Sequence, residues 1–146
     1  MATLLEQAGE VMRTKYRDQQ IDIAPDDAPV RVIADAQRTV QVIANLLDNA
    51  IKYSPVGTLV QVGAKTRKQH VEIIVRDRGP GIQADDIPRL FTRFGTLGHQ
   101  PRPGQVGSGI GLYVCKKLVE AMNGRIWVVS QAGKGSSFHF TLPRAD

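Results

Sequence analysis

The segment from Asn45 to Tyr53, NLLDNAIKY, places polar residues at regular intervals in an otherwise apolar helical pattern. Asn45, Asn49 and Lys52 recur at i, i+4 and i+7, so they share one face of a helix. The apolar residues beside them are Val42, Ile43, Leu46, Leu47, Ala50 and Ile51. Such a helix must bury one side in a core while its polar face stays open. Amide oxygens suit Mg²⁺ and a lysine suits phosphate, so the pattern fits a polar binding site as well as a solvated surface face.

Composition and length favour one soluble globular domain. The chain has 146 residues, of which 42% are hydrophobic and 23% charged, enough for a single sizeable core. It contains neither an apolar run long enough to span a bilayer nor a signal-peptide pattern at its start, so no direct membrane contact is expected. The single cysteine, Cys115, is expected to be a small core residue. The net charge of +5 is spread along the chain without a basic block, which favours a phosphate-bearing small ligand over nucleic acid.

The periodicity of apolar residues predicts alternating helices and strands without internal repeats. Helices are expected from Leu4 to about Arg17, from a cap at Asp35 to just before Pro55, from Asp85 to Phe91, and from about Ile110 to Met122. Strands are expected at residues 21–23, 30–33, 58–65, 71–76, 125–130 and 136–142, the last two as a hairpin. Residues 95–106 are rich in glycine and proline and predict a mobile loop.

Two glycine-containing segments carry further candidate chemistry. Asp77 ends a predicted strand and could accept a hydrogen bond from an amine, while the glycines of DRGPGI let the backbone approach a planar ligand; an ordinary strand-ending turn would look the same. Gly107–Leu112, GSGIGL, opens a predicted helix, where free N–H groups could bind phosphate or the glycines could form a hinge. Neither a P-loop nor a Rossmann motif fits the chain.

Taken in order, these motifs resemble the N, G1, F and G2 boxes of the catalytic ATP-binding domain of sensor histidine kinases, within the Bergerat-fold ATPase superfamily. The matching segments are Asn45–Tyr53, Asp77–Gly81, Phe91–Phe94 and Gly107–Leu112, and the resemblance covers about residues 20 to 143. It implies an α+β fold, a two-layer α/β sandwich in which a mixed sheet of about five strands packs under three helices, with a flexible ATP lid at about 95–106. The pattern of predicted helices and strands agrees with this architecture.

The resemblance also implies roles for individual residues. Asn49, with Asn45, would hold Mg²⁺, Lys52 would contact a phosphate, and Asp77 would accept the adenine amino group. Asn45, Asn49 and Lys52 would thus serve the phosphoryl transfer. The other residues implied to contact the nucleotide are Tyr53, Gly79, Gly81, Ile82, Phe94, Arg102, Gln105, Gly107, Ser108, Gly109, Ile110, Gly111 and Leu112.

Position 45 bears on whether such a domain would hydrolyse ATP or transfer its phosphate. Hydrolytic members of the superfamily resemble one another in a glutamate one turn before the magnesium asparagine, where it acts as general base for water. This chain has Asn45 there, and an amide does not take up a proton at neutral pH. The comparison favours transfer of the γ-phosphate to an acceptor, which depends chiefly on positioning and charge neutralisation.

The phosphoacceptor of a histidine kinase is a histidine in a dimerising helix, and His70, His99 and His139 do not lie in such a pattern. We therefore expect a separate or missing dimerisation and phosphoacceptor domain, relay to a response regulator, and a monomeric isolated domain. Residues 1–20 would be a connector or the tail of the dimerisation helix, 21–143 the ATP-binding domain, and 144–146 a C-terminal tail. The expected location is cytoplasmic, with membrane anchoring of an intact protein left open.

Two alternatives stay open from the sequence. A serine kinase of the anti-sigma-factor type shares the fold, although the N and G1 boxes agree better with sensor kinases. A regulatory module that binds nucleotide without transferring phosphate is the other, because intact binding motifs do not by themselves establish transfer.

Overall fold

The computed structural model describes residues 1–25, 30–92 and 111–145. The helices in this part of the chain are α1 (Ala2–Lys15), α2 (Ala36–Tyr53), the 3₁₀ helix η1 (Ala84–Arg89) and α3 (Gly111–Ala121). The strands are β1 (Ile21–Ala24), β2 (Val60–Thr66), β3 (His70–Asp77), β4 (Ile126–Ser130) and β5 (Ser136–Pro143).

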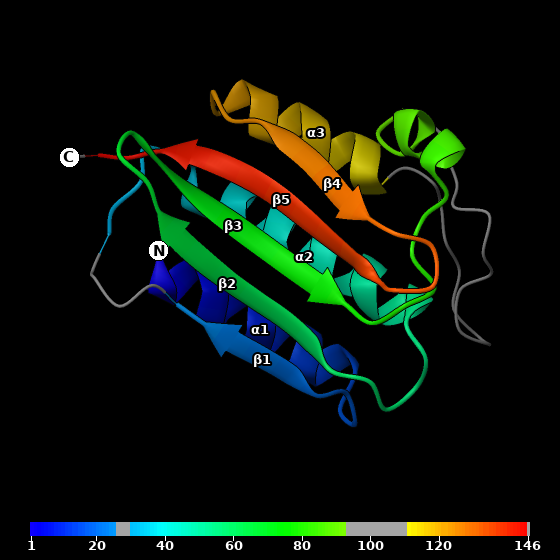
Figure 1. Cartoon of the computed structure of the whole chain (residues 1–146). Helices are drawn as coiled ribbons and strands as arrows, with labels where there is room; N and C mark the ends of the chain where they lie inside the picture. Colours follow the sequence, from blue (N-terminus) through cyan, green and yellow to red (C-terminus); the bar gives the residue numbers. More distant parts are fainter. Residues whose placement is uncertain (26–29, 93–110, 146) are drawn as a thin grey trace.

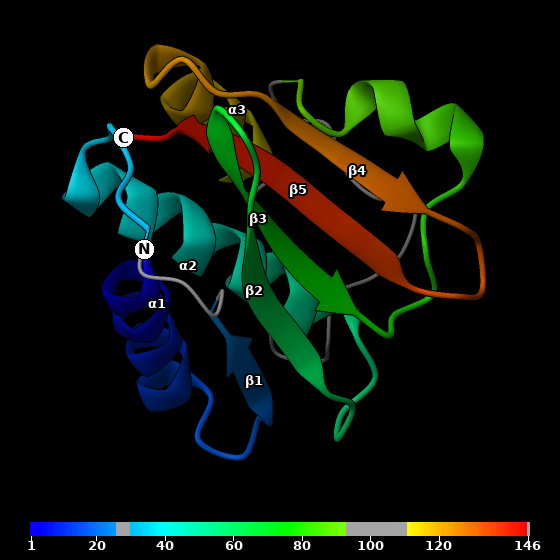
Figure 2. The same cartoon turned by 60° about the vertical axis from the view of Figure 1, so that its left-hand side comes forward.

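The described strands form one mixed sheet in the order β1-β2-β3-β5-β4. Strand β1 runs parallel to β2, and the remaining neighbours pair antiparallel. Helices α1, α2 and α3 cover one face of this sheet (Figures 1 and 2). The predicted α+β sandwich, with a mixed five-stranded sheet under three helices, is therefore confirmed.

Helix α2 is the centre of the helical layer, because it packs against α1, α3 and β3. It begins where predicted: the Asp35 side chain accepts a hydrogen bond from the backbone N–H of Arg38 at 2.9 Å. It ends at Tyr53, since Ser54 adopts an extended backbone and Pro55 cannot continue a helix. Its fully buried side chains meet those of the sheet in one core, whose largest members include Ile43, Leu46, Leu47, Ile51, Ile73, Phe138, Phe140 and Leu142.

Three local predictions differ from the structure. The predicted strand at 30–33 is wrong: only Val32 pairs, in an isolated antiparallel bridge with Arg144, because the cap of α2 follows at once. The segment predicted as a helix from Asp85 to Phe91 is a short 3₁₀ helix that contains Pro88, which lacks the N–H group that a regular helix uses. Helix α1 lies two residues earlier at both ends than expected.

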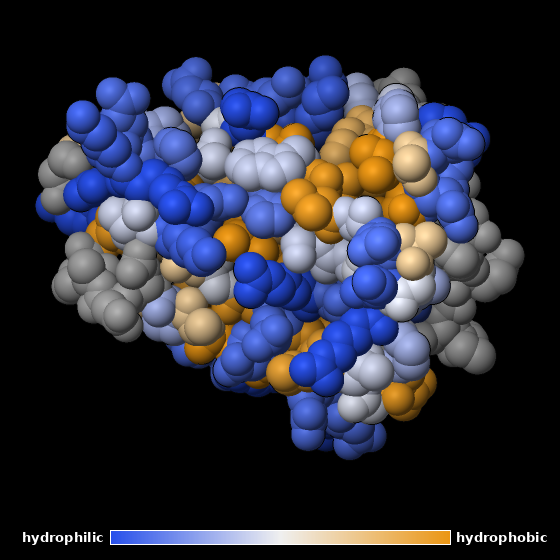
Figure 3. All heavy atoms as spheres, in the orientation of Figure 1, coloured by the Kyte–Doolittle hydropathy of each residue, from blue (hydrophilic) through white to orange (hydrophobic). Residues whose placement is uncertain are grey.

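The role of residues 1–20 as a connector or as the tail of a dimerisation helix stays a prediction. In the structure, Leu5, Ala8 and Met12 of α1 are buried in the same core as α2 and the sheet. Helices α1, α2 and α3 do not cover the opposite face of the sheet, where the described residues are mostly hydrophilic with scattered apolar side chains (Figure 3). Across the described ranges, no helix is long and apolar enough to cross a membrane.

Candidate functional site

The C-terminal half of α2 carries the first part of the candidate site. Asn45, Asn49, Lys52 and Tyr53 are all partly buried there, beside the fully buried Leu46, Leu47, Ala50 and Ile51. Burial raises the pKa of the Tyr53 hydroxyl, so that side chain is neutral at physiological pH. The polar face predicted from the sequence is therefore a half-buried polar strip rather than a fully solvated surface.

Helix α3 lies against this strip. Burial raises the pKa of the Cys115 thiol to about 12, and a hydrogen bond with the Asn45 side chain only partly opposes that effect. Cys115 is thus the buried core residue expected, and its thiol lies 3.8 Å from the Val42 carbonyl oxygen on α2. One turn before Cys115 on α3 is Gly111, and one turn after Asn45 on α2 is Asn49. Since Thr39 near the start of α2 meets Met122 after the end of α3, the two helices run in opposite directions. The start of α3 therefore lies on the Asn49 side of Asn45.

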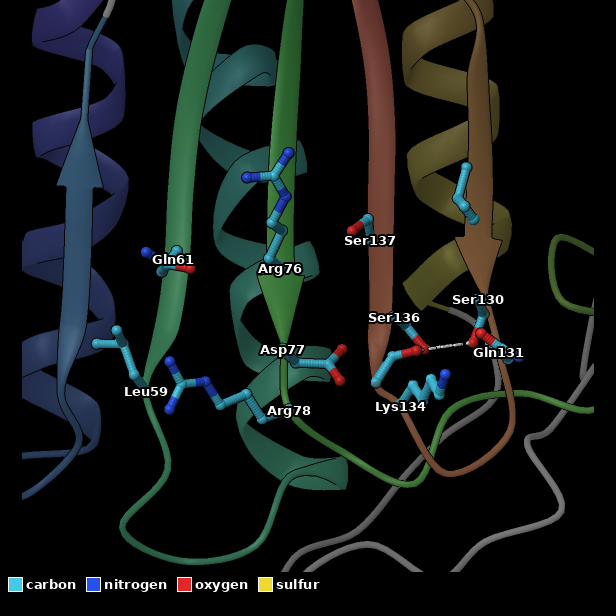
Figure 4. A pocket seen from close by; sticks show the side chains of 12 residues that line it. Leu59, Gln61, Arg76, Asp77, Arg78, Ser130, Gln131, Lys134, Ser136 and Ser137 are labelled. Carbon is cyan, nitrogen blue, oxygen red and sulfur yellow. Dashed lines mark hydrogen bonds between the residues drawn. The ribbon is translucent and has the colours of Figure 1, made fainter.

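Asp77 ends β3 and carries the second part of the site. One of its carboxylate oxygens, Oδ1, accepts the backbone N–H of Gly79 at 2.8 Å. Burial raises the pKa of Asp77, and hydrogen bonds from the Gly79 and Ser136 N–H groups oppose the shift without reversing it. Figure 4 shows the carboxylate turned toward Ser136 and Ser130. In the part of the chain that the structure describes, the printed donors to this largely buried carboxylate are backbone N–H groups, which leave it acceptor capacity for a ligand.

Gly79 explains how the end of α2 reaches Asp77. A Cβ atom on this glycine would lie 2.8 Å from the carbonyl oxygen of Tyr53 and 3.0 Å from Oδ1 of Asp77. A side chain would therefore push apart the two segments that the sequence assigned to one site. Glycine at this position therefore has a steric cause within the fold, the close approach of α2 to the turn after β3, whereas the predicted approach of a planar ligand to this backbone stays a prediction.

The turn from Asp77 to Ile82 is held by the β4–β5 connection. The backbone N–H of Ile82 donates to Oγ of Ser130 at 2.8 Å, and Ser130 Oγ lies 2.8 Å from Oγ of Ser136. Gly81 has a φ of +76°, and a side chain there would collide with the carbonyl oxygen of Gln131. Ile82 is buried in the core. These contacts fix the turn from Asp77 to Ile82, which is called the wall of the site below.

The face of the sheet opposite the three helices has a hollow near the end of β3 and the β4–β5 connection. The hollow has a volume of about 580 Å³, and its basic lining residues are Arg76, Arg78 and Lys134 (Figure 4). Residues alternate along β3, so Arg76 faces the side opposite to its buried neighbour Val75. The Arg76 side of the hollow and the α2 strip therefore lie on opposite sides of the sheet, while Asp77, at the end of β3, also lines the hollow.

The structure brings together one group of the predicted site residues and does not describe the other. Asn45, Asn49, Lys52, Tyr53, Asp77, Gly79, Gly81 and Ile82 form the strip and the wall, and Gly111 and Leu112 begin α3. The predictions for Phe94, Arg102, Gln105, Gly107, Ser108, Gly109, Ile110 and the lid at about 95–106 lie outside the described residues. Phe91, the first aromatic of its motif, packs edge-to-face on Phe138 with ring centres 6.3 Å apart.

Sequence reasoning missed the partners of Lys52. Its ammonium lies 3.0 Å from Oδ2 of Asp48, and the other oxygen of that carboxylate accepts the Tyr16 hydroxyl at 2.6 Å. The i,i+4 spacing of Asp48 and Lys52 was visible in the sequence and indicates an ion pair on a helix. The approach of Tyr16 depends on how α1 packs against α2, which local spacing does not reveal.

The described site thus offers a buried acceptor at one end and amide groups with an ammonium at the other. The acceptor is the Asp77 carboxylate, and the α2 strip carries Asn45, Asn49 and Lys52. Such a set suits a ligand with two ends. One end is a planar ring that carries a hydrogen-bond donor for Asp77, and the other is an anionic group that binds a cation and the α2 strip.

Comparisons with known proteins show which family the chain resembles. The family described as histidine kinase-, DNA gyrase B- and HSP90-like ATPases matches residues 34–146. The chain is 43% identical over 144 residues to the adaptive-response sensory kinase SasA of Synechococcus elongatus, covering 96% of this chain and 36% of that protein. The SasA of a Synechocystis species is 40% identical over 98% of this chain and 38% of its own length.

Solved structures show the same likeness. The mycobacterial sensor histidine kinase MprB superposes with a TM-score of 0.86 at 28% identity, covering 97% of this chain and 94% of that one. Full-length ShkA in complex with AMPPNP superposes with a TM-score of 0.83 at 29% identity, over 99% of this chain and 30% of that protein. The chain therefore spans about a third of the length of the curated relatives named above.

Proposed function

Because the chain belongs to the family of histidine kinase-, DNA gyrase B- and HSP90-like ATPases, we propose that it binds Mg²⁺-ATP and supplies the γ-phosphate to a histidine. That histidine would lie on a separate phosphoacceptor domain, from which a response regulator would take the phosphate. The observation that carries the proposal is the buried Asp77 carboxylate, held by backbone donors next to the polar strip of α2.

Asp77 fits an adenine amino group because it is a pre-positioned acceptor in a largely buried setting. Its Oδ1 is occupied by the Gly79 N–H, and the rest of the carboxylate can accept a further donor. A guanine ring presents a carbonyl oxygen where adenine has its amino group, so it would face the carboxylate with an acceptor. This arrangement supports selection of ATP over GTP.

The strip on α2 fits the phosphate end of the nucleotide. Magnesium prefers oxygen ligands and keeps waters and substrate phosphates in its coordination shell, so neutral amide oxygens from Asn49 and Asn45 can complete a site that the phosphates begin. When bound, the ion would neutralise charge that develops on the transferred phosphoryl group. Lys52 would hold a phosphate oxygen by a charge-assisted hydrogen bond.

Asn45 favours transfer over hydrolysis. Its amide cannot accept a proton from water at neutral pH. Among the described residues, the carboxylate beside the strip on α2 is that of Asp48. It is already bound by Lys52, Lys15 and Tyr16, so it is poorly placed to act as a base. The strip can therefore position ATP without activating a water molecule.

The acceptor is proposed to be supplied by another domain. His70 begins β3, and His139 lies in β5, where its Nδ1 is 2.8 Å from Glu72 and its ring stacks on Trp127. Both are parts of the sheet rather than of a dimerising helix. We expect the domain by itself to be monomeric.

The test combines this chain with the dimerisation domain of a related sensory kinase and γ-labelled ATP. We expect label on the added domain that is stable in base and lost in acid, as phosphohistidine is, and no label when the acceptor histidine of that domain is replaced by glutamine. Acid-stable label would point to a serine acceptor instead. ATP binding without any label would leave a regulatory nucleotide-binding module.

A further inference from the structure

The last turn of α1 is joined to the polar strip of α2 through one carboxylate. Oδ1 of Asp48 accepts the hydroxyl of Tyr16 at 2.6 Å and lies 3.1 Å from Nζ of Lys15. Oδ2 of the same carboxylate lies 3.0 Å from Nζ of Lys52. The two oxygens are therefore divided between the helices: α1 holds one, and the other faces Lys52.

The Asp48–Lys52 ion pair at the centre of this cluster is sheltered from solvent. The side chains of Asp48 and Lys52 are only 19% and 17% exposed, whereas that of Lys15 is 52% exposed. Burial by itself would raise the pKa of Asp48, but hydrogen bonds from Tyr16, Lys52 and Lys15 outweigh it and lower the pKa. The carboxylate is therefore ionised at neutral pH. A sheltered ion pair is less screened by water and salt than an exposed one, so its geometry is better defined.

Tyr16 controls the orientation of this carboxylate without adding charge. A carboxylate with one strong neutral donor on Oδ1 cannot rotate freely, because rotation would break that hydrogen bond. Its Oδ2 is then kept toward Lys52, which shares a helix face with Asn45 and Asn49. The lysine stem has four rotatable bonds, and ordering it in advance removes an entropy cost from ligand binding.

We propose that Tyr16 and Asp48 are positioning residues that hold the Lys52 ammonium in place for the phosphates of bound ATP. The proposal rests on the proposed function, because it takes the ligand of the α2 strip to be ATP. It extends the site to α1, which contributes no residue that would touch the nucleotide itself.

The test measures affinities for a non-hydrolysable ATP analogue and for adenosine in wild type and in Tyr16→Phe. Adenosine would reach Asp77 but has no phosphate for Lys52. We expect the variant to bind the ATP analogue about three- to tenfold more weakly, the effect of one lost hydrogen bond, and to bind adenosine as wild type does. A merely structural role would change both affinities together or neither.

A double-mutant cycle with Lys52→Met makes the test specific. If Tyr16 acts through Lys52, adding Tyr16→Phe to Lys52→Met should leave ATP affinity unchanged. An effect of full size in the Lys52→Met background would overturn the proposal. Lys15→Met is the matched control: it removes the exposed donor from the same oxygen, and we expect a change of less than about twofold.

The direction in which Asp48→Asn changes ATP affinity provides a second test. This test does not depend on Tyr16→Phe being stably folded. Loss of a negative charge beside an anion site should strengthen ATP binding if charge alone matters, whereas loss of the oriented ion pair should weaken it. We expect weaker ATP binding and unchanged adenosine binding, and tighter ATP binding would overturn the proposal. If the wild type binds neither ligand, the proposed function fails; if it binds both and the variants match it, only this inference fails.

Discussion

Replacement of Asp77 by asparagine should separate the binding role of this residue from its structural role. The change keeps the size and shape of the side chain. Oδ1 of Asp77 accepts the N–H of Gly79 at 2.8 Å, and the Ser136 N–H also donates to the carboxylate. An asparagine must turn its single oxygen toward these backbone donors, so its NH₂ group would face the ligand.

The expected loss of affinity follows from that orientation. An adenine amino group would meet a donor instead of an acceptor, so one hydrogen bond is lost and a donor is left unpaired on each side. Together these effects cost about 2 to 3 kcal/mol, which corresponds to about 30- to 150-fold weaker binding of an ATP analogue. Isothermal titration calorimetry at neutral pH measures this difference directly.

The Asp77→Asn variant should lose affinity for ATP without losing stability toward unfolding. The pKa of Asp77 is raised in the folded protein, so the folded state binds its proton more tightly than the unfolded state does. Its contribution to stability is therefore fully present below the usual aspartate pKa and is lost as pH rises through the folded-state pKa. Because asparagine does not ionise, the variant should be at least as stable as wild type at pH 7, as denaturant unfolding can show.

Two results would refute the reasoning about Asp77. Equal affinities of wild type and variant for the ATP analogue would remove this residue from the site. A parallel fall in affinity and in the free energy of unfolding would show that the carboxylate stabilises the fold. It would then not be a group whose burial destabilises the protein and is kept for ligand binding.

Further predictions concern the metal, the cap of α2 and acid stability. Asn49→Asp should alter the magnesium dependence of ATP-analogue binding in calorimetry while the circular dichroism spectrum stays native. An unchanged magnesium dependence would contradict the assignment of Asn49 as a metal ligand. Asp35→Ala removes the cap of α2 and should lower the free energy of unfolding by about 1 kcal/mol without changing nucleotide affinity, because the cap is at the opposite end from Lys52. Burial tends to raise the pKa of Glu72, but hydrogen bonds from His139 and Arg67 lower it, so its stabilising contribution is present above the usual glutamate pKa and is lost as pH falls through the folded-state pKa. His139→Gln should make that acid loss smaller in urea unfolding at a series of pH values, and an identical pH profile would contradict the assignment.

The features predicted well from the sequence are those that local residues determine. The cap at Asp35, the apolar stripe of α2 and its end before Pro55 depend on residues within a few turns of one another. The hairpin of β4 and β5 likewise depends on alternating residues around one short turn. These elements formed as expected because each local preference agrees with the final packing.

The features that the sequence did not reveal depend on contacts between distant segments. Residues 30–33 have the pattern of a strand, but in the structure they form an isolated bridge, Val32 with Arg144, and a single bridge does not make a strand. The meeting of Tyr16 and Asp48 depends on the packing of α1 on α2. The closeness of Gly79 to Tyr53 could be expected only from the resemblance, since no local pattern places a helix end against that turn.

The central claim is that the strip on α2 and the wall at Asp77 form one Mg²⁺-ATP site. Calorimetric titration of the protein with a non-hydrolysable ATP analogue, with and without Mg²⁺ and with the matching GTP analogue as control, tests it most directly. The account predicts saturable binding that is selective for adenine and stronger with Mg²⁺. Failure to bind the ATP analogue at millimolar concentration, or equal binding of the GTP analogue, would contradict it.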